Sequence, residues 1–144
     1  MAGLPAGVGG TLVLDCEGIV KLATGDLMAR KRFEAARRRG SHVVTAAPTL
    51  AEVLRGTPRD AAMHRVLSRI TVVPIDKKLG RAAGELLGRV GLSGHRHALD
   101  ALLAVVALQQ QRPIVLLTSD PDDLGRLTHE PDRSARDRVA VIRI

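Results

Sequence analysis

Short apolar runs alternate with longer segments of mixed polarity along this chain. The apolar runs are rich in Val, Ile and Leu and predict five strands, at residues 11–15, 42–46, 70–74, 113–118 and 139–144. Apolar residues at helical spacing predict helices between them, at residues 26–39, 48–56, 57–68, 76–90, 97–111 and 121–128. Strands that are apolar on both faces and alternate with helices indicate an α/β fold, in which helices cover both sides of a parallel sheet.

Capping residues support several of these helix ends. Thr57 and Asp76 are suitable N-caps, Pro48 suits a helix start, and Gly40 and Gly56 follow predicted helix ends. No repeat and no linker divides the 144 residues, which is a length that fits one core. We therefore expect a flexible lead-in over residues 1–10 and a single domain over residues 11–144.

One carboxylate interrupts the most apolar predicted helix. Every residue from Ala98 to Leu108 is apolar except Asp100. A buried, unpaired carboxylate costs several kcal/mol unless it is protonated, paired or bound to a metal. Asp is also favourable near a helix start, so helix capping is an alternative explanation. Capping alone does not explain the apolar residues on both sides, and Asp100 is therefore expected to have a partner.

Three other acidic residues follow predicted strands, where ligands bind in folds of this class. Asp15 ends the first strand, Glu52 lies in the short helix after the second, and Asp120 ends the fourth. Each has a structural alternative: Asp15 as a turn residue or N-cap, Glu52 as part of a solvated helix face, and Asp120 as the N-cap of the helix after it. Asp122 and Asp123 are weaker candidates.

Acidic side chains gathered at one edge of a sheet repel one another, and a divalent cation relieves that repulsion. A ligand set made only of carboxylates suits Mg²⁺ or Mn²⁺. The five histidines and the lone Cys16 show no zinc-binding spacing. The simplest partner of Asp100 is then a metal ion shared with Asp15 and Asp120, while Glu52 orients water or a second ion.

The charge balance points to an anionic partner. The chain has 22 Lys and Arg against 15 Asp and Glu, a net charge of +7, and residues 30–39 carry six cations and one acid. Nucleic acid is the usual partner of such a surface, although a solvated helix face is an alternative for residues 30–39. A carboxylate-held metal in a basic protein suits phosphodiester cleavage. Arg55 and Arg59, which follow Glu52, are the first candidates to hold the substrate backbone.

Other features of the sequence limit the kinds of partner and the cellular compartment that we expect. One Phe and no Tyr or Trp leave almost no aromatic surface on which bases could stack. A single cysteine provides no disulfide framework, the N-terminus lacks the pattern of a signal peptide, and no apolar run reaches the length of a membrane span. These features favour a cytoplasmic protein without a membrane partner.

The order and spacing of five segments resemble the PIN-domain nucleases, especially the VapC-like toxins of bacterial toxin–antitoxin pairs. The segments are LVLD, LAEVLRG, VVPID, ALDALLAVVA and LLTSDPDDL. The resemblance covers nearly the whole chain and implies a five-stranded parallel sheet and a ribonuclease dependent on Mg²⁺ or Mn²⁺. It places the acidic site at Asp15, Glu52, Asp100 and Asp120, with the Thr118 hydroxyl beside it. It also implies a homodimer and a cognate antitoxin that inserts a segment to block the cleft.

Two positions depart from the family pattern. Cys16 and Glu17 follow the first Asp, where the family usually has small or hydroxyl residues. His97 stands where some relatives carry another acid, three residues before Asp100. We expect that substitution to remove an accessory ligand, and we expect Glu17 to add a ligand, perturb the site or point away.

Two other functions fit parts of the sequence. A PIN-like module that binds RNA or protein without cleavage would account for the altered Cys16-Glu17 pair. A haloacid-dehalogenase-like phosphatase would use Asp15 as the nucleophile, because LVLDCEGIV resembles that motif, with help from Lys77 or Lys78. In the phosphatase, Glu17 would replace an expected second Asp, and Glu52 and Asp100 would have no role. A P-loop and a Ser–His–Asp site are excluded because their motifs are absent from the sequence.

Overall fold

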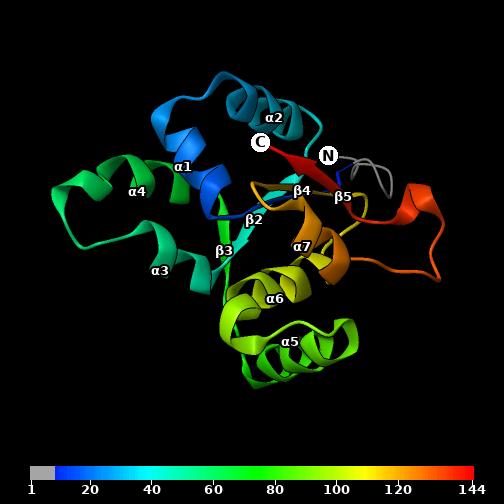
Figure 1. Ribbon diagram of the computed structural model, residues 1–144. Helices are drawn as coiled ribbons and strands as arrows, with labels where there is room; N and C mark the ends of the chain where they lie inside the picture. Colours follow the sequence, from blue (N-terminus) through cyan, green and yellow to red (C-terminus); the bar gives the residue numbers. More distant parts are fainter. Residues whose placement is uncertain (1–8) are drawn as a thin grey trace.

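The computed structural model describes residues 9–144, so most of the predicted lead-in lies outside the described residues. Five strands form one sheet, in the order β3-β2-β1-β4-β5 (Figure 1). Every neighbouring pair is parallel, as predicted. The strands are β1 (Thr11–Leu14), β2 (His42–Ala46), β3 (Thr71–Val73), β4 (Ile114–Thr118) and β5 (Ala140–Arg143).

Seven α-helices connect the strands within residues 9–144. They are α1 (Cys16–Thr24), α2 (Leu27–Arg38), α3 (Leu50–Val53), α4 (Ala61–Leu67), α5 (Lys77–Val90), α6 (Gly94–Leu108) and α7 (Pro121–Leu127). Short 3₁₀ turns precede α3 and α4 and lie just before β5.

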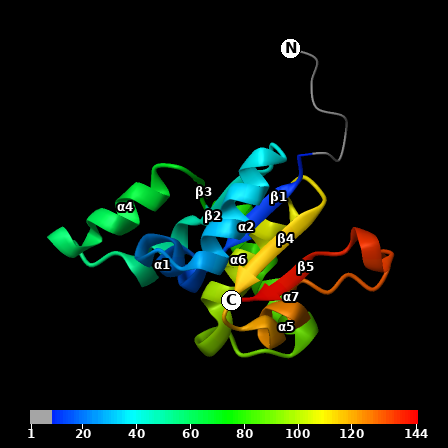
Figure 2. The same cartoon turned by 90° about the horizontal axis from the view of Figure 1, so that it is seen from above.

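The two faces of the sheet bury separate apolar cores, because successive strand side chains point to opposite sides. Val13 and Leu116 pack with buried residues of α5, α6 and α7. Leu12, Leu14 and Leu117 pack on the other face with α1, α2 and α3, and α4 adds partly buried residues. Figure 1 shows the two helical layers, with α1 and α2 on one side of the sheet and α5 and α6 on the other, and Figure 2 looks onto the side of α1 and α2. The predicted covering of both faces is confirmed.

The strand order reverses between β1 and β4. From β1 the chain adds β2 and β3 on one side, and it then returns to place β4 and β5 on the other side. Ligands of open α/β sheets bind at the carboxyl ends of the strands at such a reversal. Asp15 and Ser119 follow the two strands that meet there.

The sequence interpretation missed α1 and overextended the helix after β2. Helix α1 is short and begins at the Asp15 N-cap, and Gly25 ends it in a left-handed conformation (φ 83°). The predicted helix over residues 48–56 is instead a 3₁₀ turn followed by α3, because the backbone is already extended at Leu54. The predicted start of α6 at His97 is also late, since the helix begins at Gly94.

The side chain of Asp60, and not that of the predicted Thr57, stabilises the turn before α4. Thr57 makes no side-chain capping hydrogen bond. The buried Asp60 carboxylate instead accepts the backbone N–H groups of Arg55 (2.9 Å) and Gly56 (2.7 Å). The Asp60 carboxylate, which follows the turn in the sequence, therefore stabilises the turn after α3.

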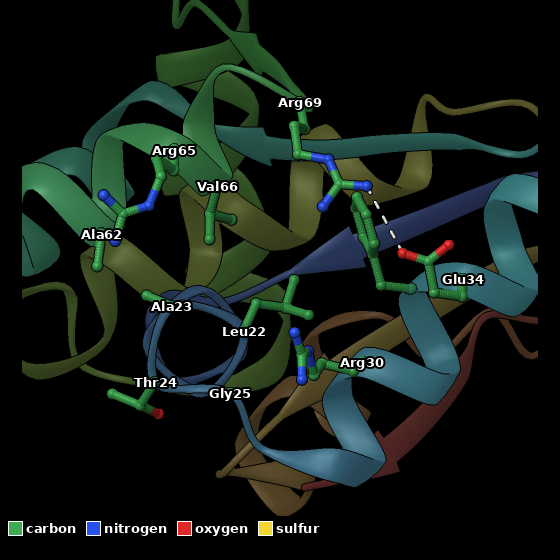
Figure 3. Close-up of a pocket in the computed structure, with 11 residues that line it drawn as sticks. Leu22, Ala23, Thr24, Gly25, Arg30, Glu34, Ala62, Arg65, Val66 and Arg69 are labelled. Carbon is green, nitrogen blue, oxygen red and sulfur yellow. Dashed lines mark ion pairs between the residues drawn. The ribbon is translucent and has the colours of Figure 1, made fainter.

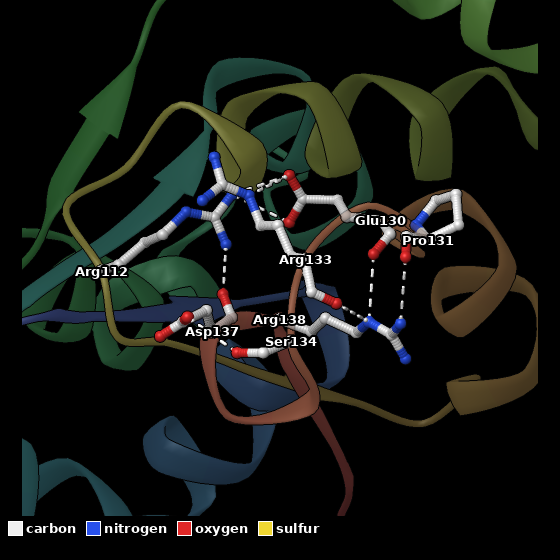
Figure 4. Close-up of polar contacts among 7 residues, drawn as sticks. All are labelled: Arg112, Glu130, Pro131, Arg133, Ser134, Asp137 and Arg138. Carbon is white, nitrogen blue, oxygen red and sulfur yellow. Dashed lines mark hydrogen bonds and ion pairs between the residues drawn. The ribbon is translucent and has the colours of Figure 1, made fainter.

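A cluster of charged side chains fixes the long connection between α7 and β5 (Figure 4). The Glu130 carboxylate contacts Arg112 at 2.8 Å, just before β4, and Arg133 at 2.9 Å. Arg112 also donates to the Asp137 carbonyl (2.7 Å), and Arg138 donates to the carbonyls of Glu130 and Arg133. These contacts tie the connection to the start of β4.

No helix within residues 9–144 is both long and apolar enough to cross a membrane.

Candidate active site

Asp15 lies where β1 gives way to α1, and it is 8% exposed. One carboxylate oxygen accepts the N–H of Gly18 (2.8 Å), and the other accepts the N–H of Ser119 (3.1 Å), just beyond β4. The N-cap alternative for Asp15 is therefore confirmed. The second bond also fixes this carboxylate between the ends of β1 and β4, at the reversal of strand order.

Asp120 lies just beyond the end of β4 and caps α7. Its carboxylate accepts the N–H of Asp123 (3.3 Å), as the capping alternative expected. The backbone N–H of Asp120 donates to the Thr118 hydroxyl (2.9 Å), which is fully buried. Thr118 therefore holds the turn that presents Asp120, and it does not face solvent.

Asp100 projects from α6 into a group of acidic side chains. Burial raises the pKa of the Asp100 carboxyl above its usual range, and the charges of Asp120, Glu52 and Asp123 raise it further. His97 opposes this rise. Negative charge therefore reaches Asp100 from α3, which carries Glu52, and from the N-cap and first turn of α7, which carry Asp120 and Asp123.

The closest set of ligand atoms within residues 9–144 is His97, Asp100 and Asp123. These atoms all lie within 4.8 Å of one another. His97 Nδ1 is 3.3 Å from an Asp123 oxygen and 3.8 Å from an Asp100 oxygen. The predicted metal set of Asp15, Asp100 and Asp120 is not this set, although both include Asp100. Sequence reasoning gave Asp123 little weight and treated His97 as a lost ligand.

Glu52 lies on α3 and is exposed. Burial, a hydrogen bond to Glu52 and the charges of Glu52 and Asp15 raise the pKa of the Cys16 thiol to about 12. Cys16 therefore remains a neutral thiol at physiological pH and does not supply a thiolate nucleophile or ligand. Glu17 lies in the first turn of α1.

The two arginines expected to hold substrate lie in the turn after α3. The Arg55 guanidinium donates to the carbonyls of Ala51, Glu52 and Leu54, so it caps the C-terminal end of α3. Arg59 is exposed in the same turn. Of the two, Arg59 is better placed to reach a substrate without breaking internal hydrogen bonds.

The residues present fit a hard or borderline divalent cation. The group offers carboxylate oxygens from three or more side chains, which Mg²⁺ and Mn²⁺ prefer, together with one imidazole nitrogen. After burial, the charges of Asp120, Glu52 and Asp123 raise the pKa of Asp100, and a bound cation would offset this repulsion.

A separate cavity of about 460 Å³ lies between α1, α2 and α4 (Figure 3). Leu22, Phe33 and Val66 are among its apolar lining, and Arg30 and Arg65 are among its cations. A further lining cation, the Arg69 guanidinium, lies 4.8 Å from the centre of the Phe33 ring and 3.5 Å from Glu34. The cavity therefore combines an apolar lining with positive charge.

Comparison with known proteins identifies the family to which this fold belongs. Residues 13–129 match the PIN domain. The chain belongs to the PIN-domain family. This assignment confirms the resemblance and removes support for the phosphatase alternative. No curated protein sequence matches the chain.

Two solved structures share the PIN fold over most of this chain. A chain of the VapBC2 crystal structure from Rickettsia felis, bound to a DNA fragment from its promoter, has a TM-score of 0.66 and 17% identity. That match covers 93% of this chain and 98% of the other. A chain of a toxin–antitoxin complex from Klebsiella pneumoniae has a TM-score of 0.60 and 19% identity, covering 78% and 88%. At these identities, the likeness establishes the fold.

Proposed function

We propose that this PIN-domain protein is a divalent-metal-dependent endoribonuclease and the toxin of a toxin–antitoxin pair. The observation that carries the proposal is the convergence on Asp100 of acidic side chains from α3, α7 and the end of β4. This convergence lies by the reversal of strand order in a protein of net charge +7. Acidic side chains crowded in this way repel one another, and a bound cation would offset that repulsion.

In the proposed reaction, Asp100 and Asp120 would hold a Mg²⁺ or Mn²⁺ ion, with Asp15 beside them. When bound, the ion would neutralise phosphate charge and make a water molecule a better nucleophile. The exposed Glu52 carboxylate would orient the attacking water and accept its proton, while the phosphorus–oxygen bond to the leaving nucleotide breaks. Asp15 is itself fixed by two backbone N–H groups, and the buried Thr118 hydroxyl fixes the Asp120 turn. Arg59, and Arg55 after releasing its carbonyls, would hold the RNA backbone.

We also infer a cognate antitoxin and a homodimer as partners. The two similar structures come from a VapBC2 complex and a toxin–antitoxin complex. The cavity between α1, α2 and α4 suits a peptide with apolar and acidic side chains, because it joins Leu22 and Phe33 to Arg30 and Arg65. Arg65→Glu is expected to weaken copurification with an antitoxin encoded beside this protein.

RNA cleavage by the purified protein tests the function. End-labelled structured RNA would be incubated with Mg²⁺ or Mn²⁺, with EDTA as the chemical control. Asp100→Asn removes the central charge, and Asp122→Asn removes an exposed charge next to Asp123. We expect wild type and Asp122→Asn to cleave, and Asp100→Asn to cleave on the order of a hundredfold more slowly.

Other outcomes favour other functions. Equal cleavage by wild type and Asp100→Asn would contradict the proposal and indicate a contaminant or another site. Metal binding without cleavage of any RNA would favour the non-catalytic PIN-like module, and the Cys16-Glu17 pair would then be the first change to revert.

A further inference from the structure

We propose that His97 binds the divalent ion directly through Nδ1 and makes this centre prefer Mn²⁺ to Mg²⁺. The inference rests on the proposed metal site: it keeps Asp100 as a ligand and adds His97 and Asp123. It reverses the expectation that His97 removes an accessory ligand from the site.

The positions of the three side chains carry the inference. His97 and Asp100 are three residues apart on α6 and therefore share one face of the helix. Asp123 lies in the first turn of α7, and its carboxylate is the nearer of the two to His97 Nδ1. The imidazole Nδ1 therefore lies near an oxygen of each carboxylate.

The distances between these atoms are close to those around a single ion. Two ligands on adjacent corners of an octahedron with bonds of about 2.1 Å lie about 3.0 Å apart, and opposite corners lie about 4.2 Å apart. The distances from Nδ1 are 3.3 Å to Asp123 and 3.8 Å to Asp100. All three ligand atoms lie within 4.8 Å of one another, so side-chain rotations would bring them onto one ion.

The surroundings leave this group open to an ion and its water molecules. The side chains of His97, Asp100 and Asp123 are 18%, 35% and 26% exposed, so the group is neither sealed nor on the open surface. Within residues 9–144, no lysine or arginine forms an ion pair with Asp100 or Asp123. The only basic group that contacts these two carboxylates in that range is the imidazole itself.

The nitrogen ligand sets the metal preference. Mg²⁺ takes oxygen ligands and keeps several waters, whereas imidazole suits transition metals. A site with two carboxylates and one imidazole should therefore gain affinity for Mn²⁺ from His97 and gain almost none for Mg²⁺. Removing His97 should lower the affinity for Mn²⁺ by at least about tenfold, the loss common even for residues that only support a ligand.

Pulsed electron paramagnetic resonance of Mn²⁺ bound to the whole protein tests the bond itself. A directly bound imidazole gives a ¹⁴N coupling to the Mn²⁺ signal. We expect this coupling in wild type and in His95→Ala, and its loss in His97→Ala. His95 is the matched control because it is an exposed histidine in the first turn of α6. Titration calorimetry with Mn²⁺ and Mg²⁺ gives the change in preference, and His97→Asn serves if the alanine variant does not fold.

The outcomes separate this inference from the proposed function. Mn²⁺ that binds wild type without ¹⁴N coupling would overturn the role of His97 and leave the carboxylate site standing. Coupling that survives in His97→Ala would also overturn it. If wild type binds neither Mn²⁺ nor Mg²⁺, the proposed metal-dependent function fails together with the inference.

Discussion

At the scale of single residues, Asp100 lies where its carboxylate meets the charges of Asp120, Glu52 and Asp123. Such repulsion destabilises the folded protein whenever Asp100 is ionised and no cation is bound. The same crowding is what a cation site requires. Residues that serve a site in this way are expected to cost stability in the metal-free protein.

Asp100→Asn should therefore stabilise the protein in EDTA at pH 7. The pKa of Asp100 is raised on folding, so the native state binds more protons than the unfolded state, and wild-type stability falls as pH rises. We expect a gain below about 1 kcal/mol, because the side chain is 35% exposed and water screens the repulsion. Urea unfolding from pH 7 to pH 4 measures it, and the gain should shrink toward pH 4. A loss of stability at pH 7 would contradict the crowding argument.

Asp60 should show the opposite dependence on pH. The backbone N–H of Arg55, followed by that of Gly56, holds the pKa of the Asp60 carboxyl below its usual range. Its stabilisation is present above pH ~4, the ordinary pKa of Asp, and is lost as pH falls through the lower folded value. Asp60→Asn should lower the melting temperature at pH 7 and have less effect at pH 2. The exposed Asp132→Asn is the control, and equal melting curves for both variants would contradict this role.

The sequence indicated Asp15, Glu52, Asp100 and Asp120 because each is an acid after a strand or within an apolar helix. It did not indicate His97 and Asp123 as partners, because their contact depends on how α6 packs against α7. Asp123 also resembled an ordinary residue in the first turn of a helix. The spacing of His97 and Asp100 on one helix face was the available signal.

At the scale of elements, the sequence predicted the five strands because buried parallel strands are short apolar runs. Helix α1 gave a weaker signal because it is nine residues long and contains Gly18. The Asp15 N-cap and Gly25 at its end marked it nevertheless. The break after α3 could not be read locally, since the Asp60 carboxylate five residues later stabilises the turn.

Glu130 should be the residue that fixes the connection from α7 to β5. It is 23% exposed and pairs with both Arg112 and Arg133. Glu130→Ala leaves both guanidinium groups without this carboxylate, and we expect a loss of about 1–3 kcal/mol in the free energy of unfolding. Asp132→Ala, an exposed change in the same connection, should stay within about 0.5 kcal/mol. Equal effects in denaturant titrations would show that the cluster does not stabilise the fold.

At the scale of the whole molecule, a chain of net charge +7 contains an acidic group around Asp100. In the proposed function, the positive charge would attract a polyanion and the acidic group would hold the cation that the reaction needs. With one Phe and no Tyr or Trp, we expect the proposed recognition of RNA to depend on charge and shape more than on stacking.

RNA binding should therefore weaken steeply with salt. Asp100→Asn keeps labelled RNA intact, so fluorescence anisotropy can measure affinity from 50 to 200 mM salt. We expect a loss of at least about tenfold, which corresponds to a few phosphate contacts. Affinity that does not change with salt would contradict a binding surface made mainly of arginine and lysine.

The acidic group around Asp100 is proposed to hold a divalent ion. The anomalous signal of Mn²⁺ in a soaked crystal of the protein tests this proposal. We expect a peak bonded to carboxylate oxygens of Asp100 and of a second acid from α7 or the end of β4. A Mn²⁺ peak only at another place on the protein, or none at this group, would show that the acidic group does not hold the ion.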